Sequence, residues 1–252
     1  MFETALKEYG LDRCSISGES LIIGVGAQEP LGGVVDIVPR EPQEVFFLNG
    51  PEQVDLIRAF SKSTAAEKVQ HLSLGSSHLV AEQKGSLDFT EAVSALSGSA
   101  FPALKTMSLG DMERLFNGHC YYGRLGDLAP IFSCAPKLQS LEVYGHFSLS
   151  APVQHDYLID LSAIVDEIGV TGGPPSQACI DHLLESRFAK MKRIELWLDD
   201  GSDDLKFSVP NTFIAGSGMP KLETFAMDHL REDTLTKIRQ WASQRAIRLH
   251  LE

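Results

Sequence analysis

A short apolar frame occurs four times in this chain without gaps, and it constrains the fold more than any other feature. Each copy has apolar residues at the first, fourth and sixth positions of L-x-x-L-x-L, usually after a proline. The last two apolar positions are two residues apart, so they point to the same face of a short strand. The preceding proline cannot donate to a β-ladder and therefore belongs to the loop that leads into the strand. The four copies occupy residues 101–109, 135–143, 188–196 and 219–227.

Weaker copies of the frame begin at Val69, Val165 and Ala246, which places the first positions of successive copies 24 to 35 residues apart. The segments between the copies carry apolar residues three or four apart, a spacing that predicts helices. Strands that alternate with helices in this way build a solenoid with the strands on the inner curve. We expect the helices over residues 89–96, 125–132, 175–186 and 233–243.

The frame resembles the leucine-rich repeat, and its irregular length and F-P-x-L-K lead-in are similar to bacterial leucine-rich-repeat proteins. The resemblance covers about residues 65–252 and implies an α/β solenoid, with parallel strands on the concave face and helices on the convex face. The asparagine that follows the strand in the standard repeat is replaced here by Gly110, Tyr144, Trp197 and Asp228. We therefore expect no regular asparagine ladder.

Residues 1–65 lack the frame, and they are expected to form an N-terminal α/β cap. Apolar segments at 21–25, 34–38 and 45–48 predict strands, and a helix is expected over 51–61. A cap is needed because the open end of a solenoid exposes core residues. Residues 66–252 then form the irregular solenoid, which packs with the cap as one continuous domain.

Charge narrows the class of partner. The chain has 34 acidic and 22 basic residues, a net charge of −12 with histidine neutral. Nucleic acids and anionic membranes attract basic surfaces, so both are disfavoured, whereas a basic protein partner fits the charge. The most apolar stretch, residues 21–25, is far too short to span a bilayer. Four cysteines without a C-x-x-C pair indicate reduced thiols and a cytoplasmic protein.

No motif in the chain indicates catalysis. Gly24 and Gly26 begin like a dinucleotide-binding loop, but the third glycine is absent. The eight histidines include no H-E-x-x-H motif and no close ligand pair. The acidic segment 199–204 lacks the spacing of a calcium loop, and it is either a solvated loop or an acidic recognition loop. We expect no catalytic, cofactor-binding or metal-binding residues.

The strand phase predicts a candidate binding face. If the apolar positions of each frame face the core, the residues between and just after them lie on the concave surface. Tyrosine and tryptophan are common interface anchors, and carboxylates would meet lysine or arginine on a partner. A plain solvated face remains the alternative, and a slip of one residue in phase would reverse every side chain. The candidate residues are Glu142, Tyr144, Glu167, Glu195, Trp197, Asp199 and Asp228.

These features together predict a non-enzymatic protein-binding module. A small acidic protein of this kind would suit an immunity protein that neutralises a bacterial toxin. An adaptor that links a bound protein to another machine is the alternative, and it would need a second surface, expected within residues 1–65. An enzyme with an unrecognised site is the third possibility, which a deep pocket holding a perturbed carboxylate or histidine would favour.

Overall fold

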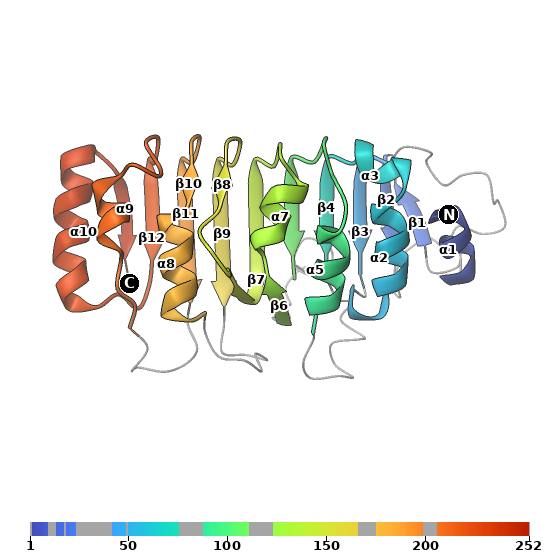
Figure 1. Cartoon of the computed structure of the whole chain (residues 1–252), viewed down its shortest axis with the longest axis horizontal. Coiled ribbons are helices and arrows are strands. Elements are labelled where there is room, and N and C mark those ends of the chain that lie inside the picture. The colour runs from blue at the N-terminus through green and yellow to red at the C-terminus, as the bar shows by residue number, and fades with distance from the viewer. Residues whose placement is uncertain are drawn as a thin grey trace.

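The computed structural model describes residues 2–9, 14–17, 19–23, 42–48, 50–75, 88–110, 123–165, 175–198 and 206–251. These residues form an α/β structure built on one mostly parallel sheet, whose strands follow one another in chain order (Figure 1). The order is β1-β2-β3-β4-β5-β7-β9-β11-β12-β13, and β6 pairs with β7 beside this path. Among the described pairs, β1 with β2 is antiparallel and the others are parallel.

The strands are short, and those that carry a frame begin at its third position. Their bounds are β1 Cys14–Ser17, β2 Ser20–Ile23, β3 Glu44–Phe47, β4 His71–Leu74, β5 Thr106–Leu109, β6 Gly123–Asp127, β7 Ser140–Ser148, β9 Asp160–Val165, β11 Arg193–Leu198, β12 Thr224–Met227 and β13 Arg248–Leu251. A separate parallel pair consists of β8 (Gln154–His155) and β10 (Arg187–Phe188).

The helices of the described chain lie along one face of the sheet, and the opposite face is here called the open face (Figure 1). Their bounds are α1 Phe2–Tyr9, α2 Val54–Ser61, α3 Thr64–Lys68, α5 Thr90–Ser97, α7 Ala129–Cys134, α8 Gln177–Glu185, α9 Asn211–Ala215 and α10 Glu232–Arg245, with a 3-10 turn η2 at Gly50–Glu52. None of these helices has the length and apolar character needed to cross a bilayer.

Alternation along the central strands puts the core between the sheet and the helices. In β7, Leu141 and Val143 are buried while Glu142 and Tyr144 are half-buried, and β11 repeats the pattern with Ile194 and Leu196. The predicted strand phase is therefore the one found in β7 and β11. It follows from the period-2 geometry of a strand with one apolar face.

The lead-in turns repeat as closely as the sequence does. The backbone N–H of the first frame residue donates to the carbonyl three residues earlier: Leu104 to Phe101 at 3.2 Å, Leu138 to Ala135 at 3.0 Å, Met191 to Phe188 at 3.2 Å and Leu222 to Met219 at 3.4 Å. At the start of each of the four strands that follow these turns, two successive N–H groups then donate to one carbonyl of the preceding unit. The Lys192 carbonyl, for example, accepts from Glu223 and Thr224.

The unit that contains β9 was missed from the sequence. Its frame is Leu158, Leu161 and Ala163, all buried, whereas the predicted frame starts at Val165, the last residue of β9, and its later positions Ile168 and Val170 lie outside the described residues. In this unit the imidazole of His155 replaces the turn carbonyl: its Nδ1 accepts from the Leu158 N–H at 3.0 Å, and its Nε2 donates to the Ala135 carbonyl at 2.9 Å. Burial lowers the pKa of His155, and the neutral ring fits this pair of bonds.

The region predicted to be a cap contributes strands to the same sheet. β2 pairs in parallel with β3, and β3 with β4, so residues 20–23 and 44–47 continue the ladder of the frames. The predicted helix at 51–61 corresponds to η2 and α2, and the predicted strand at 34–38 lies outside the described residues. The predicted helix at 125–132 is wrong in its first half, because β6 covers 123–127 and α7 begins at Ala129.

Candidate functional site

The open face of β7, β9 and β11 brings six side chains into two adjacent rows. In the first row Glu142 and Glu195 are both in register with Ser162, which lies between them. In the second row, nearer the carboxyl ends of the strands, Tyr144 and Trp197 are both in register with Ile164. All six side chains are half-buried. These residues (Glu142, Tyr144, Ser162, Ile164, Glu195 and Trp197) are called the open-face patch.

Strand spacing sets the dimensions of the patch. Neighbouring strands lie about 4.8 Å apart, so Glu142 and Glu195 are held about 10 Å apart on either side of Ser162. Tyr144 and Trp197 have the same separation. Successive residues on one face of a strand are about 7 Å apart, so the two rows are close neighbours. A partner thus meets two carboxylates beside two aromatic rings on a rigid sheet.

The acidic row is only partly neutralised by the chain itself. Arg193 Nε lies 3.1 Å from Asp160 Oδ1, and Arg193 Nη1 lies 3.7 Å from Glu195 Oε1. No described cation forms an ion pair with Glu142. Three carboxylates therefore face one guanidinium in this region, and the excess negative charge suits a cationic partner. Asp160 was not among the predicted residues, because its strand was expected farther along the chain.

Asp228 does not belong to this exposed surface, contrary to the sequence expectation. It is 8% exposed, and its two carboxylate oxygens accept the Leu198 N–H at 2.8 and 2.9 Å. The residue thus ties the end of β12 to the end of β11. Its place just after the strand, where the standard repeat has asparagine, is the signal that indicates such a role.

Two other predicted residues, Glu167 and Asp199, lie outside the described residues. The structure therefore brings together Glu142, Tyr144, Glu195 and Trp197 from the predicted set. It adds Ser162 and Ile164, which the sequence analysis missed. Both residues would have followed from a frame with alanine at its sixth position, Leu158-x-x-Leu161-x-Ala163.

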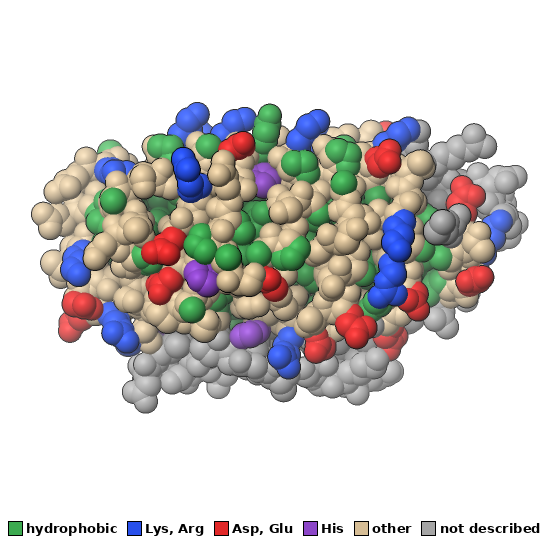
Figure 2. All heavy atoms as spheres, in the orientation of Figure 1, with side chains coloured by type: hydrophobic (Ala, Val, Ile, Leu, Met, Phe, Trp, Pro, Cys, Tyr) green, Lys and Arg blue, Asp and Glu red, His purple; other side chains and the backbone are tan. Residues whose placement is uncertain are grey.

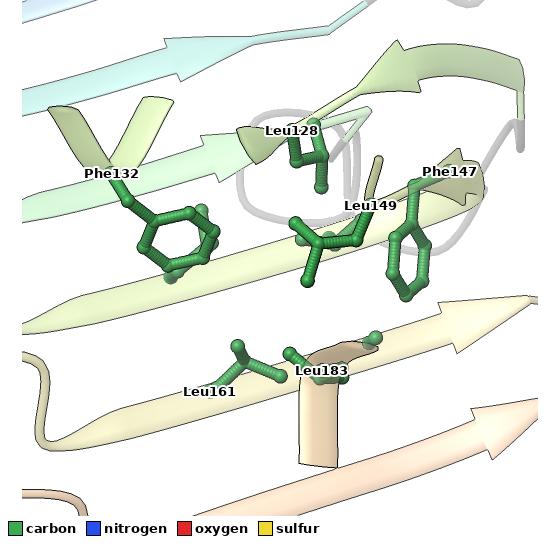
Figure 3. A pocket seen from close by; sticks show the side chains of 9 residues that line it. Leu128, Phe132, Phe147, Leu149, Leu161 and Leu183 are labelled. Atoms are coloured by element: carbon green, nitrogen blue, oxygen red, sulfur yellow. The ribbon is translucent and has the colours of Figure 1, made fainter. Parts of the chain in front are cut away.

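A cavity in the described interior is too small to hold a substrate. A cavity of about 10 Å³ lies between the sheet and helices α7 and α8, where Phe132, Leu161 and Leu183 are among the side chains that line it (Figure 3). A water molecule needs at least about 10–15 Å³ and polar partners, and every residue that lines this cavity is apolar. Nearby, burial raises the pKa of the Cys134 and Cys179 thiols to about 12, which keeps them protonated and unreactive.

Within the described ranges, no group of three or more His, Cys, Asp or Glu residues is arranged to hold a metal ion.

No protein-family model, curated protein or solved structure matches this chain. The open-face patch and its charge are therefore the observations from which a function is argued.

Proposed function

We propose that this chain is a non-enzymatic protein-binding module of the leucine-rich-repeat type. The repeated lead-in turns and the chain-ordered parallel strands support a solenoid built from one recurring unit. In such a solenoid the open face is the concave face, and β7, β9 and β11 supply its centre. A rigid sheet is suited to binding because its side chains are already positioned before the partner arrives.

The open-face patch carries the proposal. Two half-buried aromatic rings, Tyr144 and Trp197, lie one row away from Glu142 and Glu195. Tyrosine and tryptophan are enriched among residues that dominate binding energy, and carboxylates select for lysine or arginine. The partner is therefore a basic protein that inserts an apolar group between the rings and presents cations about 10 Å apart.

The biological form that we propose is an inhibitor, specifically an immunity protein that occupies the basic cleft of a toxin in the cytoplasm. An acidic face that fills a basic active site would block access without any chemistry of its own. The protein's net charge of −12 would accelerate encounter with a basic target, and this acceleration falls with ionic strength. The buried thiols of Cys134 and Cys179 are compatible with a reducing compartment.

The test is a pull-down with the tagged full chain from its native cytoplasm, at low and at moderate salt, followed by mass spectrometry. The decisive comparison uses Glu195→Arg combined with Trp197→Ala against the control Glu91→Arg combined with Ala95→Ser on the helix face. We expect a basic partner whose capture weakens with salt, disappears with the open-face variant and survives in the control. Equal capture by both variants would remove the patch as the binding site.

A further inference from the structure

A second surface lies at the edge of the sheet where the strands begin, and its charge is opposite to that of the open-face patch. Lys137, Lys190 and Lys221 each stand three residues before the first residue of a strand, at β7, β11 and β12. Tyr157 has the same place before β9. Because the lead-in turns repeat, these four residues follow one another along the edge. They are called the amino-edge row.

The position three residues before a strand is basic along much of the sheet edge. Of the seven strands β4, β5, β7, β9, β11, β12 and β13, five are preceded by a lysine or arginine at this position, with Lys68 and Arg245 as the outer members. Figure 2 shows Lys and Arg side chains along the same edge, which is the upper edge in Figure 1. In a chain with 34 acidic residues this edge is a local reversal of sign.

The lysines of the row have no acidic partner within the described chain. None of Lys137, Lys190 and Lys221 forms an ion pair there. Two residues after Lys190, by contrast, Lys192 is paired with Glu223 at 2.9 Å. All three lysines of the row are exposed, so their charge is available to a partner.

Tyr157 gives the row an aromatic contact. Among described residues it stands out as a large hydrophobic side chain that is exposed, at 42%. The Nζ of Lys190 lies 4.1 Å from the centre of its ring, a cation–π contact that holds the ammonium group beside the aromatic edge. An exposed ring between cations is a favourable place for the backbone and aliphatic carbons of a bound peptide.

We propose that the amino-edge row binds an extended acidic segment of a second protein. From Lys137 to Lys221 the row crosses three strand spacings, about 14 Å. In an extended peptide, every second side chain is on one side and recurs about every 7 Å, so acidic residues at i, i+2 and i+4 span the same length. The match in length and charge defines the ligand as a short run of alternating aspartate or glutamate residues.

An acidic protein segment fits better than a polyanion of larger extent. Charges farther away than about 10 Å are screened at physiological salt, so a short segment responds to the row alone. A nucleic acid or an anionic membrane extends well beyond the row and would meet the field of a chain with net charge −12. With the open-face patch occupied by a basic protein, the row would connect that complex to an acidic one, as an adaptor does.

The experiment is fluorescence anisotropy with the full chain and a labelled peptide of alternating glutamate and serine. A peptide with glutamine in place of glutamate is the ligand control. The test variant combines Lys137→Glu, Lys190→Glu and Lys221→Glu. The matched variant makes the same charge change at three exposed lysines elsewhere, with Lys62→Glu, Lys206→Glu and Lys237→Glu.

We expect salt-sensitive binding of the glutamate peptide and none of the glutamine peptide. The row variant should bind at least about tenfold more weakly, because three exposed charge pairs are lost and replaced by repulsion. The matched variant should stay within about threefold of the parent. Equal losses in both variants, or no binding of the glutamate peptide, would overturn the proposal.

Two further arms separate the alternatives. Binding to single-stranded DNA or to phosphatidylserine vesicles without binding to the glutamate peptide would overturn the acidic-segment proposal in favour of a polyanion surface. The Trp197→Ala variant should bind the peptide as the parent does, since Trp197 lies on the open face rather than at the amino edge. Failure of the open-face proposal and failure of this one are thus measured independently.

Discussion

The open face differs sharply between its β4–β5 region and its β7–β11 region, although the same ladder rows run through both. In the β4–β5 region, the row that carries Glu142 and Glu195 holds Ser73 and Ser108, which are 7% and 2% exposed. In the β7–β11 region the two rows hold the charged residues Glu142 and Glu195 and the aromatic residues Tyr144 and Trp197, and their side chains are half-buried. An unchanged backbone register can thus carry two different surfaces. The recurring apolar positions determine the fold, and the two variable positions of each strand determine what the face can bind.

The largest effect on the free energy of unfolding is expected in β11, where the neighbouring residues Glu195 and Leu196 lie on opposite faces. Leu196→Ala should lower the free energy of unfolding by about 2–5 kcal/mol, because it leaves a cavity between the sheet and the helices. Glu195→Ala should change it by no more than about 0.5 kcal/mol, since its side chain is on the open face. Urea denaturation followed by circular dichroism measures both. A large loss for Glu195→Ala would mean that the two faces of β11 are reversed.

A smaller loss is expected at Asp228, where a structural carboxylate occupies a place that the sequence assigned to binding. Asp228→Ala should cost about 1–3 kcal/mol, because the buried Leu198 N–H loses its acceptor. Asp228→Asn keeps one oxygen and should lose less. Partner binding at a temperature where the variant stays folded should match the parent. A stable Asp228→Ala variant that fails to bind would return the residue to the binding face.

His155 makes the unit that contains β9 sensitive to pH. Burial lowers its pKa in the folded state below the value of about 6.5 in the unfolded chain, so the unfolded state binds the proton more readily. The neutral ring contributes its full stability above about pH 7. This contribution is lost as the pH falls below the pKa that the imidazole has in the unfolded chain. Unfolding free energies measured between about pH 7.5 and 5.5 should fall more steeply for the parent than for His155→Gln. Parallel curves would exclude His155 as the cause.

The smallest effect on stability is expected at Ser108, in the β4–β5 region of the open face. Its buried Oγ has no hydrogen-bond partner in the described structure, so Ser108→Ala removes an unsatisfied polar atom. The free energy of unfolding should stay the same or rise by up to about 1 kcal/mol. The same substitution at Ser162, which lies within the patch, should leave stability within about 0.5 kcal/mol. Thermal melts of the two variants provide the comparison.

Sequence patterns were sufficient for those units whose frames are complete. The phase of β7 and β11 follows from Leu141, Val143, Ile194 and Leu196, because two apolar residues two apart can face only one side of a strand. The unit around β9 was missed because Ala163 replaces the third leucine and His155 replaces the turn residue. Local periodicity also failed at residues 123–127, where β6 forms by pairing with β7, a contact that no local pattern records.

The role of Asp228 shows the same limit for the site. A carboxylate just after a strand reads as exposed in the sequence, and only the position of the Leu198 N–H on the neighbouring strand turns it into a buried acceptor. The placement of Glu142 and Glu195 in one row also required the register of three strands to be known. Residue type and spacing thus predicted an acidic and aromatic surface. Which residues belong to that surface depended on tertiary contacts.

The carbonyl that accepts from two N–H groups at the start of strands such as β7 and β12 has a mechanical consequence. The Lys192 carbonyl holds two successive N–H groups of the next unit, and the Lys105 carbonyl does the same for Gln139 and Ser140. If the chain is pulled from the β13 end, force reaches one such clamp at a time, because each strand is bonded mainly to its neighbours in the chain. Extension in an optical trap should then proceed in steps of one unit, each releasing about 20 to 35 residues, the spacing of the first frame residues once the β9 frame starts at Leu158.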